Sequence, residues 1–402
     1  MGGPEKPLNI LAVATYYRPY LSGLTVHLQR LAEAVVAQGH RVTVLAARFP
    51  ASAALRETLG GVHVVRAPVW FSVGKGVVAP ALFTQFSPLA RDADAVWLFL
   101  PQAEAGALAW LAKKRLGKKL VVSYLCDVSL GNRVSDRVVE RLLAASHRMA
   151  LKKADAIVAS SQPYAASSPL LKGFLDKVVV LPPPVPRLSW NPENVATLRQ
   201  RLGLAAGQPV VGWVGRVSRE KGLHVLAAAM PQVWAVFPQA RVVCAGPRRE
   251  VAGEGRYLAE VTRMVEGFGE RWMFTGVLPD QELAAFYALC TVLAFPSINR
   301  TEAFGMVQGE AMSCGTPVVA SDLPGVREPV QLTGMGLLVP PGDPQALAEA
   351  LTAVLADPGR FRAGRPGALE ELAPGAVAAR LLRIFTQVLH RPLGDSTPVA
   401  LQ

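Results

Sequence analysis

The chain has 402 residues, 51% of them hydrophobic, and this length indicates two domains that each bury a core. No apolar run reaches the roughly 18 residues that a membrane-spanning helix needs, and the opening residues MGGPEKP lack the hydrophobic segment of a secretory signal. The four cysteines lie far apart without a C-x-x-C pair, so we expect buried, reduced thiols and a cytoplasmic protein.

The net charge of +12 belongs entirely to the first half. Residues 1–190 carry 23 Lys and Arg against 11 Asp and Glu, whereas residues 191–402 carry 19 of each. The excess predicts a negatively charged partner for one domain, either an anionic membrane surface or a phosphorylated acceptor. A basic surface without any partner is the alternative. Nucleic acid is disfavoured because no recognition motif accompanies the charge.

Both halves open with the same expected elements: an apolar strand, a loop, an amphipathic helix and a second strand. These lie at 8–14, 16–23, 25–38 and 41–46 in the first half, and at 210–215, 216–222, 223–237 and 241–245 in the second. The two strands are offset by 32 residues in each half, from Ile10 to Val42 and from Val210 to Val242. A repeated βαβ unit of this length predicts an α/β protein with two parallel-sheet domains and ligand loops at the carboxyl ends of the strands.

The run LPPPVP at 181–186 predicts a stiff joint between the domains. We therefore place the first domain at 1–185 and the second at 186–375. Apolar residues at helical spacing from Val377 to Leu389 predict a helix in the remaining segment, 376–402. We expect the tail from Pro392 to be frayed.

The stretch from Phe295 to Ser321 combines a potential anion-binding site with two carboxylates. A strand ends at Phe295, a polar loop leads to Glu302, and a helix is expected at about 304–313. The N–H groups of Gly305, Met306 and Val307 at its start would bind a phosphate, helped by the helix dipole. Glu302 and Glu310 would repel that phosphate unless they hold sugar hydroxyls, since an ionised carboxylate only accepts hydrogen bonds. In the alternative reading, Glu302 caps the helix and Glu310 is solvated.

The motif E-A-F-G-M-V-Q-G-E, followed by A-M-S-C-G-T-P-V-V-A-S, resembles the retaining nucleotide-sugar glycosyltransferases of family GT4. The resemblance covers nearly the whole chain and is strongest across 210–355. It implies the GT-B fold, with two Rossmann-like domains, an interdomain cleft, and a C-terminal helix that crosses back onto the first domain.

The resemblance also implies a donor site on the second domain. Arg216 and Lys221, in V-G-R-V-S-R-E-K-G, match the family's cations on the donor diphosphate, where they would stabilise the charge of the leaving group. A solvated loop is the alternative. Glu302 would hold the donor sugar and Glu310 the ribose. The N–H groups around Phe304–Val307 would face the sugar and phosphates, and Val277 and Leu278 would line the base pocket.

The first domain departs from the family pattern. Gly23 ends a loop that resembles the family's P-x-x-G-G segment over the donor phosphate, but Ser22 replaces the first glycine. Leu125 stands where the family often has a histidine facing the donor sugar, although Asp127 remains. A missing polar contact would alter donor choice or weaken turnover. Asp127 either substitutes in part or caps a strand end.

Basic and apolar residues in the first half predict peripheral attachment to an anionic membrane. Arg133, Arg137, Arg141, Arg148 and Lys152 form a stripe at helical spacing, and Lys113–Lys119 is a basic cluster. The segment 70–86 is apolar and aromatic, but it is broken by glycines, Lys75 and Pro80. The alternative is that the charged residues form an ordinary solvated face and the apolar residues belong to the core, without any membrane contact.

We therefore expect a retaining hexosyltransferase that uses a UDP- or GDP-linked sugar and a cell-envelope glycolipid, lipid-linked saccharide or polysaccharide acceptor. No His/Cys/Asp ligand cluster is visible in the sequence, so we expect neither metal nor cofactor. Two alternatives remain: another GT-B enzyme, such as a nucleotide-sugar epimerase or phosphorylase, and an inactive module that binds nucleotide sugar.

Overall fold

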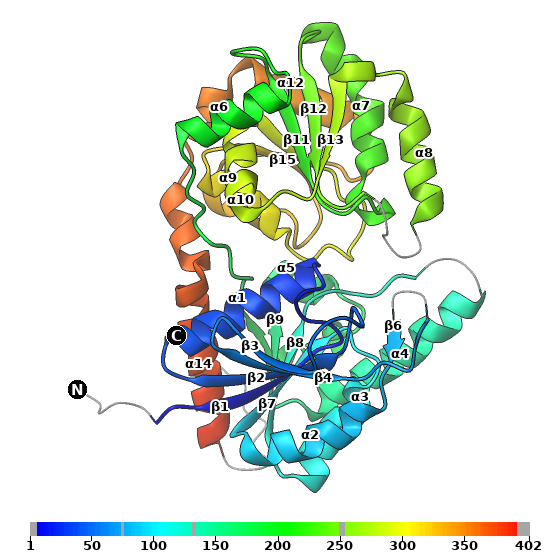
Figure 1. Cartoon of the computed structure of the whole chain (residues 1–402), viewed down its shortest axis with the longest axis vertical. Helices are drawn as coiled ribbons and strands as arrows, with labels where there is room; N and C mark the ends of the chain where they lie inside the picture. The colour runs from blue at the N-terminus through cyan, green and yellow to red at the C-terminus, as the bar shows by residue number, and fades with distance from the viewer. Residues whose placement is uncertain (1–5, 74–75, 131–133, 249–253, 392–402) are drawn as a thin grey trace. The chain divides into compact units, whose positions relative to one another are not determined.

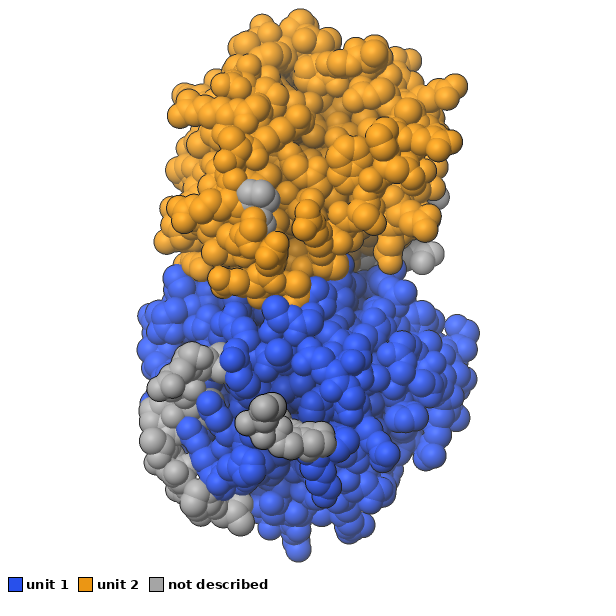
Figure 2. Space-filling model, turned by 90° about the vertical axis from the view of Figure 1, so that its left-hand side faces the viewer, with its two compact units in different colours: residues 1–184, 374–402 blue, residues 185–373 orange. Residues whose placement is uncertain are grey.

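The computed structural model describes residues 6–73, 76–130, 134–248 and 254–391 (Figure 1). Arg133, Lys75 and the tail from Pro392 lie outside the described residues. The chain forms two compact units, coloured separately in Figure 2: unit 1 contains residues 1–184 and 374–402, and unit 2 contains residues 185–373. Each unit is built on a predominantly parallel sheet flanked by helices, which confirms the predicted α/β class.

Unit 1 has an eight-stranded sheet in the order β10-β9-β8-β7-β1-β2-β4-β3, parallel except for the β3–β4 pair. Its strands are β1 Asn9–Val13, β2 Arg41–Ala47, β3 Arg56–Leu59, β4 Val62–Ala67, β7 Ala95–Leu100, β8 Lys119–Tyr124, β9 Ala156–Ala159 and β10 Val178–Val180. In a separate two-stranded sheet, β5 Phe71–Val73 pairs antiparallel with β6 Gly76–Val78. Its α-helices are α1 Gly23–Ala37, α2 Ala81–Asp92, α3 Ala105–Trp110, α4 Val134–Lys153, α5 Gln162–Ser167 and α14 Pro374–His390. A π-helical turn (Leu111–Arg115) extends α3, and a 3-10 segment (Leu171–Lys177) precedes β10. Every residue of β7 and β8 is buried, as expected for central parallel strands covered on both faces.

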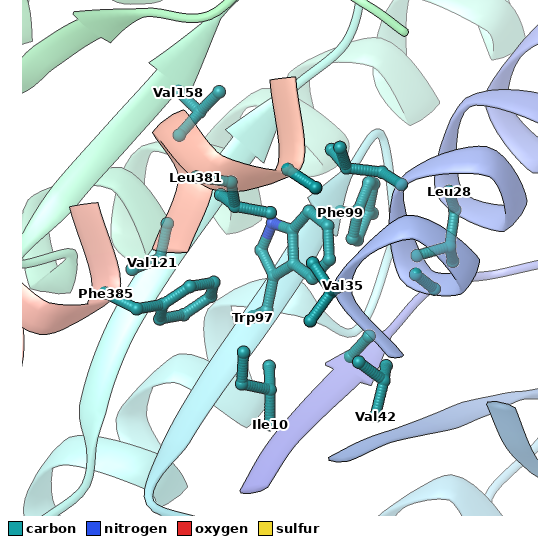
Figure 3. Packing of buried hydrophobic residues seen from close by; sticks show 14 of the residues in the cluster. Ile10, Leu28, Val35, Val42, Trp97, Phe99, Val121, Val158, Leu381 and Phe385 are labelled. Carbon is teal, nitrogen blue, oxygen red and sulfur yellow. The ribbon is translucent and has the colours of Figure 1, made fainter. Parts of the chain in front are cut away.

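Helix α14 returns the end of the chain to the sheet of unit 1. Figure 3 shows Leu381 and Phe385 of this helix packed over Trp97 of β7. The ring centroids of Trp97 and Phe385 lie 5.9 Å apart, and the indole N–H of Trp97 donates to Ser123 Oγ at 2.8 Å. Helix α14 also packs against α1, where Gln38 Nε2 donates to the carbonyl of Gly375 at 2.8 Å. The helix predicted from the apolar spacing after Pro374 is therefore present, and it covers the core of unit 1.

Unit 2 has a six-stranded, fully parallel sheet in the order β13-β12-β11-β14-β15-β16. Its strands are β11 Val210–Val214, β12 Arg241–Ala245, β13 Trp272–Gly276, β14 Val292–Phe295, β15 Val318–Ser321 and β16 Gly336–Val339. Its α-helices are α6 Pro192–Arg201, α7 Leu223–Val236, α8 Gly255–Glu266, α9 Asp280–Leu289, α10 Met306–Ser313, α11 Glu328–Thr333, α12 Pro344–Ala356 and α13 Pro358–Arg362, and short 3-10 segments lie at Arg219–Lys221, Gly269–Arg271 and Pro366–Leu372. Val210 pairs with Arg241, whereas Ile10 pairs with Val42 in unit 1. The predicted offset of 32 residues is therefore correct in unit 1 and one residue too long in unit 2.

Candidate active site

The sheet of unit 2 changes its direction of growth between β11 and β14. Strands β12 and β13 add to one side of β11, and β14, β15 and β16 add to the other. The loops that follow β11 and β14 therefore meet at the carboxyl edge of the sheet, which is where open α/β sheets bind ligands. The first loop carries Arg216 and Lys221, and the second carries Glu302 and Gly305.

These two loops are in direct contact. The backbone N–H of Ile298 donates to the carbonyl of Glu220 at 3.0 Å. Gly222, which precedes α7, has a φ of +67° and sits so close to the second loop that an added Cβ would lie 1.8 Å from the carbonyl oxygen of Pro296. A side chain at position 222 would force the loops apart, so the glycine is what allows them to meet.

We expect Gly222→Ala to lower the stability of the protein by about 2 to 4 kcal/mol, because it combines a backbone clash with a left-handed backbone conformation. Thermal unfolding followed by circular dichroism measures this loss. Gly203→Ala is the matched control, since Gly203 also has a positive φ of 60° but no atom lies within 4 Å of an added Cβ. Equal losses in the two variants would show that the contact between the loops is unimportant.

The contact brings Lys221 and Glu302 together as an ion pair. Lys221 Nζ donates to Glu302 Oε2, and both side chains are mostly buried. The same ammonium lies 5.5 Å from the centroid of the Phe295 ring at the end of β14. Glu302 does not cap α10, because the N-cap position is held by Gly305 without any side-chain hydrogen bond. The capping alternative for Glu302 is therefore wrong.

Arg216 lies on the same loop as Lys221 and contacts Glu220. Its guanidinium Nη2 lies 3.8 Å from Glu220 Oε1, and Glu220 also accepts a hydrogen bond of 2.7 Å from Ser218 Oγ. The site consequently has two cations on one loop, and the second loop supplies a carboxylate. Arg219, which lies between the cations in sequence, pairs with Glu260 and stacks over Tyr257 at 4.9 Å.

Helix α10 begins at Met306, two residues later than predicted, because Phe304 is drawn into the core. The Phe304 side chain is buried, and Gln308 Nε2 donates to its carbonyl at 2.9 Å. Gly305 then turns the chain with a φ of +81°, at a point where a Cβ would lie 2.6 Å from the Phe295 ring. Any contact of Phe304 with a ligand is thus limited to its backbone. Gly305, Met306 and Val307 lie at the positive end of the α10 dipole.

Glu310 is buried within α10. Its Oε2 accepts a hydrogen bond of 2.7 Å from the hydroxyl of Tyr287 on α9. The alternative that Glu310 is solvated is therefore wrong. A buried carboxylate held by a tyrosine keeps a fixed orientation and retains acceptor capacity for further donors.

The candidate base pocket lies at the end of β13. Val277 is 58% exposed, whereas Leu278 packs against the core of unit 2. Beside them the backbones run close together: Gly246 N donates to Gly276 O at 2.8 Å, and a Cβ on Gly246 would lie 2.1 Å from Gly215 O. Gly215 and Gly246 thus follow β11 and β12, and Gly276 is the last residue of β13. The exposed Val277 side chain adjoins an edge made of bare backbone, which suits a planar apolar ring.

Gly23 and Ser22 form the start of α1 in unit 1. Ser22 is the N-cap, and its Oγ accepts from the N–H of Thr25 at 3.2 Å, while Thr25 Oγ1 accepts from the N–H of Ser22 at 2.9 Å. This capping box explains the serine that replaces the family's glycine. An added Cβ on Gly23 would meet no atom within 4 Å, so local packing does not require glycine at this position.

Asp127 is the centre of a buried polar network. Its Oδ1 accepts hydrogen bonds from the hydroxyls of Tyr124 at 2.6 Å and Ser168 at 2.7 Å, and its N–H donates to the Tyr164 hydroxyl at 2.6 Å. Burial first, and the Asp127 charge second, raise the pKa of both tyrosines. Asp127 Oδ2 is buried with no hydrogen-bond partner among the described residues. Leu125, at the family's histidine position, packs against the core of unit 1.

A cluster of aromatic and acidic residues at the edge of unit 1 was missed by the sequence analysis. The sheet of unit 1 reverses between β1 and β7, and Tyr16 and Glu104 follow these two strands. Tyr16, Tyr20 and Phe49 lie with ring centroids 4.8 to 5.4 Å apart. Burial raises the pKa of the Glu104 carboxyl, and burial together with Tyr20 and Glu104 raises the pKa of Tyr16 to about 12. The signal that could have found them is their position just after two strands that an α/β fold places side by side.

The chain thus has two Rossmann-like units, and in unit 2 the Lys221–Glu302 ion pair lies at the switch point, where the strand order reverses between β11 and β14. This combination defines the GT-B class of glycosyltransferase. The chain matches the profile "Glycosyl transferase 4-like domain" over residues 22–184 and "Glycosyl transferases group 1" over residues 208–357. It therefore belongs to the group 1, GT4-like family of glycosyltransferases and is itself a glycosyltransferase.

Two curated relatives are similar in sequence. The 2-deoxystreptamine N-acetyl-D-glucosaminyltransferase of Streptomyces fradiae is 31% identical over 386 residues, which cover 88% of this chain and 87% of that protein. The D-inositol 3-phosphate glycosyltransferase of Segniliparus rotundus is 31% identical over 278 residues, which cover 65% of this chain and 59% of that protein.

Solved structures show the same fold at lower sequence identity. Sucrose-phosphate synthase from Thermosynechococcus elongatus superposes with a TM-score of 0.76 at 23% identity, covering 95% of this chain and 99% of that one. Anabaena Alr3699/HepE in complex with UDP-glucose gives a TM-score of 0.74 at 22% identity, covering 94% of this chain and 100% of that one. At this identity the likeness supports the GT-B fold.

Proposed function

We propose that the protein transfers a hexose from a UDP- or GDP-linked sugar to a hydroxyl group of a cell-envelope glycolipid, a lipid-linked saccharide or a polysaccharide, with retention of anomeric configuration. The observation that carries the proposal is the Lys221–Glu302 pair, formed by two loops that meet at the switch point of unit 2. It joins a cation for phosphate and an acceptor for sugar hydroxyls in one place, beside the N-terminus of α10.

The donor diphosphate binds Arg216 and Lys221 in this proposal. The bond between the anomeric carbon and the phosphate oxygen breaks, and the leaving diphosphate gains negative charge that the two cations stabilise. Lys221 has three N–H donors, so its ammonium can keep Glu302 while it donates to phosphate oxygens. The N–H groups around Gly305–Val307 add the field of the helix dipole.

The carboxylates then orient the rest of the donor. Glu302 accepts hydrogen bonds from hydroxyls of the hexose, and Glu310, held by Tyr287, accepts them from the ribose. The base lies against Val277 and Leu278 at the glycine edge of the sheet. In unit 1, Gly23 and Asp127 are proposed to bind substrate through a backbone N–H and the buried Oδ2, respectively.

Retention follows if attack and departure occur on one face of the sugar. The acceptor hydroxyl forms the new glycosidic bond as the old one breaks, and its proton passes to the departing phosphate oxygen. This step uses no protein base. It also uses no metal ion, since Arg216 and Lys221 supply the positive charge, and no cofactor is proposed.

A second acceptor class is favoured by the sequence relatives. The names of the two relatives include D-inositol 3-phosphate and 2-deoxystreptamine, which are small hydroxylated rings. The half-buried cluster of Tyr16, Tyr20 and Glu104 in unit 1 offers aromatic faces and a carboxylate to such a ring. A polar cyclitol is therefore the second candidate, without any change to the donor chemistry.

Release of nucleoside diphosphate tests the proposal. A thermal-shift comparison of UDP and GDP first identifies the donor base, because the ligand that binds raises the apparent stability. The matching α-linked sugar nucleotide is then incubated with a glycolipid or a cyclitol acceptor, with and without EDTA. We expect acceptor-dependent release that EDTA leaves unchanged, and an α-glycoside by NMR. A β-glycoside, or loss of activity with EDTA, would contradict retention or metal independence respectively.

The same experiment separates the remaining alternatives. An epimerised or phosphorylated sugar without any glycoside would identify another reaction of the GT-B fold. Binding of donor without release of nucleoside diphosphate, with every acceptor tried, would identify an inactive module. Within the described residues, no helix combines the length and apolarity needed to cross a bilayer. We propose that the enzyme works in the cytoplasm, peripherally at the membrane.

A further inference from the structure

The solvent-facing side of α4 in unit 1 carries several exposed apolar side chains, which a surface helix does not usually present. The helix buries His147, Ala150 and Leu151 on its inner side. Its outer side should therefore be polar, yet it exposes a row of aliphatic and sulfur side chains. Val134 is 78% exposed and Leu142 is 67% exposed, and the other members of the row are Val138, Val139 and Met149.

Cations border this apolar row, and carboxylates are absent from it. Arg137, Arg141, Arg148 and Lys152 are exposed on the same side of α4, at spacings that repeat the helical turn. The acidic residues of the helix, Asp136 and Glu140, are less exposed. Glu140 is also turned towards the preceding loop, where its Oε1 accepts from the N–H of Leu130 at 2.6 Å. The exposed residues of α4 are thus aliphatic, cationic or small.

Helix α3, which packs against α4, and the π-helical turn that extends it carry a similar pair of side chains. Gly106 of α3 is packed against α4 so closely that an added Cβ would lie 2.5 Å from Met149 Cε. Further along, Lys113 Nζ binds Asp155 Oδ1, just beyond α4, at 2.8 Å. Trp110 lies between these two contacts in sequence, is exposed, and has the Arg115 guanidinium 5.5 Å from its ring. An indole beside an arginine repeats the combination found along α4.

We propose that this surface, defined by the exposed apolar and basic residues of α4 together with Trp110 and Arg115, docks the protein on a bilayer of anionic lipids. Aliphatic side chains on one face of a helix, flanked by Arg and Lys, enter the interface while the cations bind lipid phosphates. The charge of the units supports this partner: unit 1 carries 25 Lys and Arg against 12 Asp and Glu, and unit 2 carries 17 against 18.

A second copy of the chain fits the surface less well. A two-fold symmetric contact places the same patch on both sides, so the arginines of α4 would face one another without carboxylates between them. The anionic bilayer removes that repulsion and also covers the apolar row. The inference goes beyond the sugar-transfer chemistry and does not depend on it, because docking is measured without any donor or acceptor.

Vesicle flotation tests the proposal with the full chain and two variants. We expect the wild-type protein to float with vesicles of phosphatidylcholine mixed with phosphatidylglycerol, less so as salt is raised, and not with phosphatidylcholine alone. Each cation at an anionic surface contributes about fivefold to the partition coefficient, so Arg137→Gln with Arg141→Gln should lower it about 25-fold. Leu142→Gln, which removes an inserted aliphatic group, should lower it about tenfold.

The control variant is Arg263→Gln with Arg362→Gln, which removes two exposed arginines from α8 and α13 of unit 2. It should float like the wild type, and all variants should keep the same unfolding midpoint because the altered side chains are exposed. Equal flotation of the wild type and the variant with Arg137→Gln and Arg141→Gln would overturn the proposal. Failure of the wild type to bind the vesicles would also overturn it. A dimer in light scattering that Leu142→Gln converts to monomer would assign the surface to a second copy instead.

Discussion

Glu302→Gln is expected to lower kcat by about 100- to 1000-fold while the fold remains intact. The glutamine has the same shape but lacks the charge, so it removes the counter-ion of Lys221 and replaces one hydrogen-bond acceptor by a donor. The sugar hydroxyls that donate hydrogen bonds to the carboxylate would then be held in the wrong orientation. Initial rates of nucleoside diphosphate release at saturating donor measure the effect.

Glu282→Gln is the matched control for this prediction. Glu282 also forms an ion pair in unit 2, with Arg201 at 2.5 Å, but both side chains are exposed on α9 and α6. Exposed pairs contribute little, so this variant should retain wild-type turnover and stability. If Glu302→Gln also kept wild-type turnover, the proposed contact of Glu302 with the donor sugar would be wrong.

Arg216→Gln should lower kcat by a similar factor, because a guanidinium that meets the leaving diphosphate acts mainly in the transition state. The donor KM should change far less than kcat. Arg219→Gln is the control on the same loop: Arg219 is half exposed and pairs with Glu260, so its loss should leave kcat within about twofold of the wild type. Equal losses in the two variants would indicate a general effect of loop charge.

The parts of the fold that were predictable are those set by local patterns. Continuous apolar runs such as AVWLFL at β7 mark central parallel strands, and the spacing from Val377 to Leu389 marks α14. The position of Arg216 and Lys221 after one strand, and of Glu302 after another, placed them at the carboxyl edge of a parallel sheet. That edge is where the structure brings Lys221 and Glu302 together.

What could not be predicted depends on contacts between distant segments. Helix α10 begins at Met306 because the Phe304 side chain is buried in the core. The residues next to Phe304 in the sequence do not predict this burial. The partner of Glu310 is Tyr287 on another helix, and the network around Asp127 needs Tyr164 and Ser168 from far along the chain. Tyr16 and Glu104 were missed for the same reason, since only the strand order makes them neighbours.

The return of α14 to the first sheet has a consequence for how the polypeptide matures as it leaves the ribosome. Unit 2 is one continuous segment, so it can complete its core as soon as residue 373 has been synthesised. The N-terminal 184 residues are synthesised earlier, but their core stays incomplete because α14 cannot pack on Trp97 until this last helix emerges. The order of completion is thus the reverse of the order of synthesis, and a ribosome that stalls before residue 374 would release a chain with an exposed apolar sheet face.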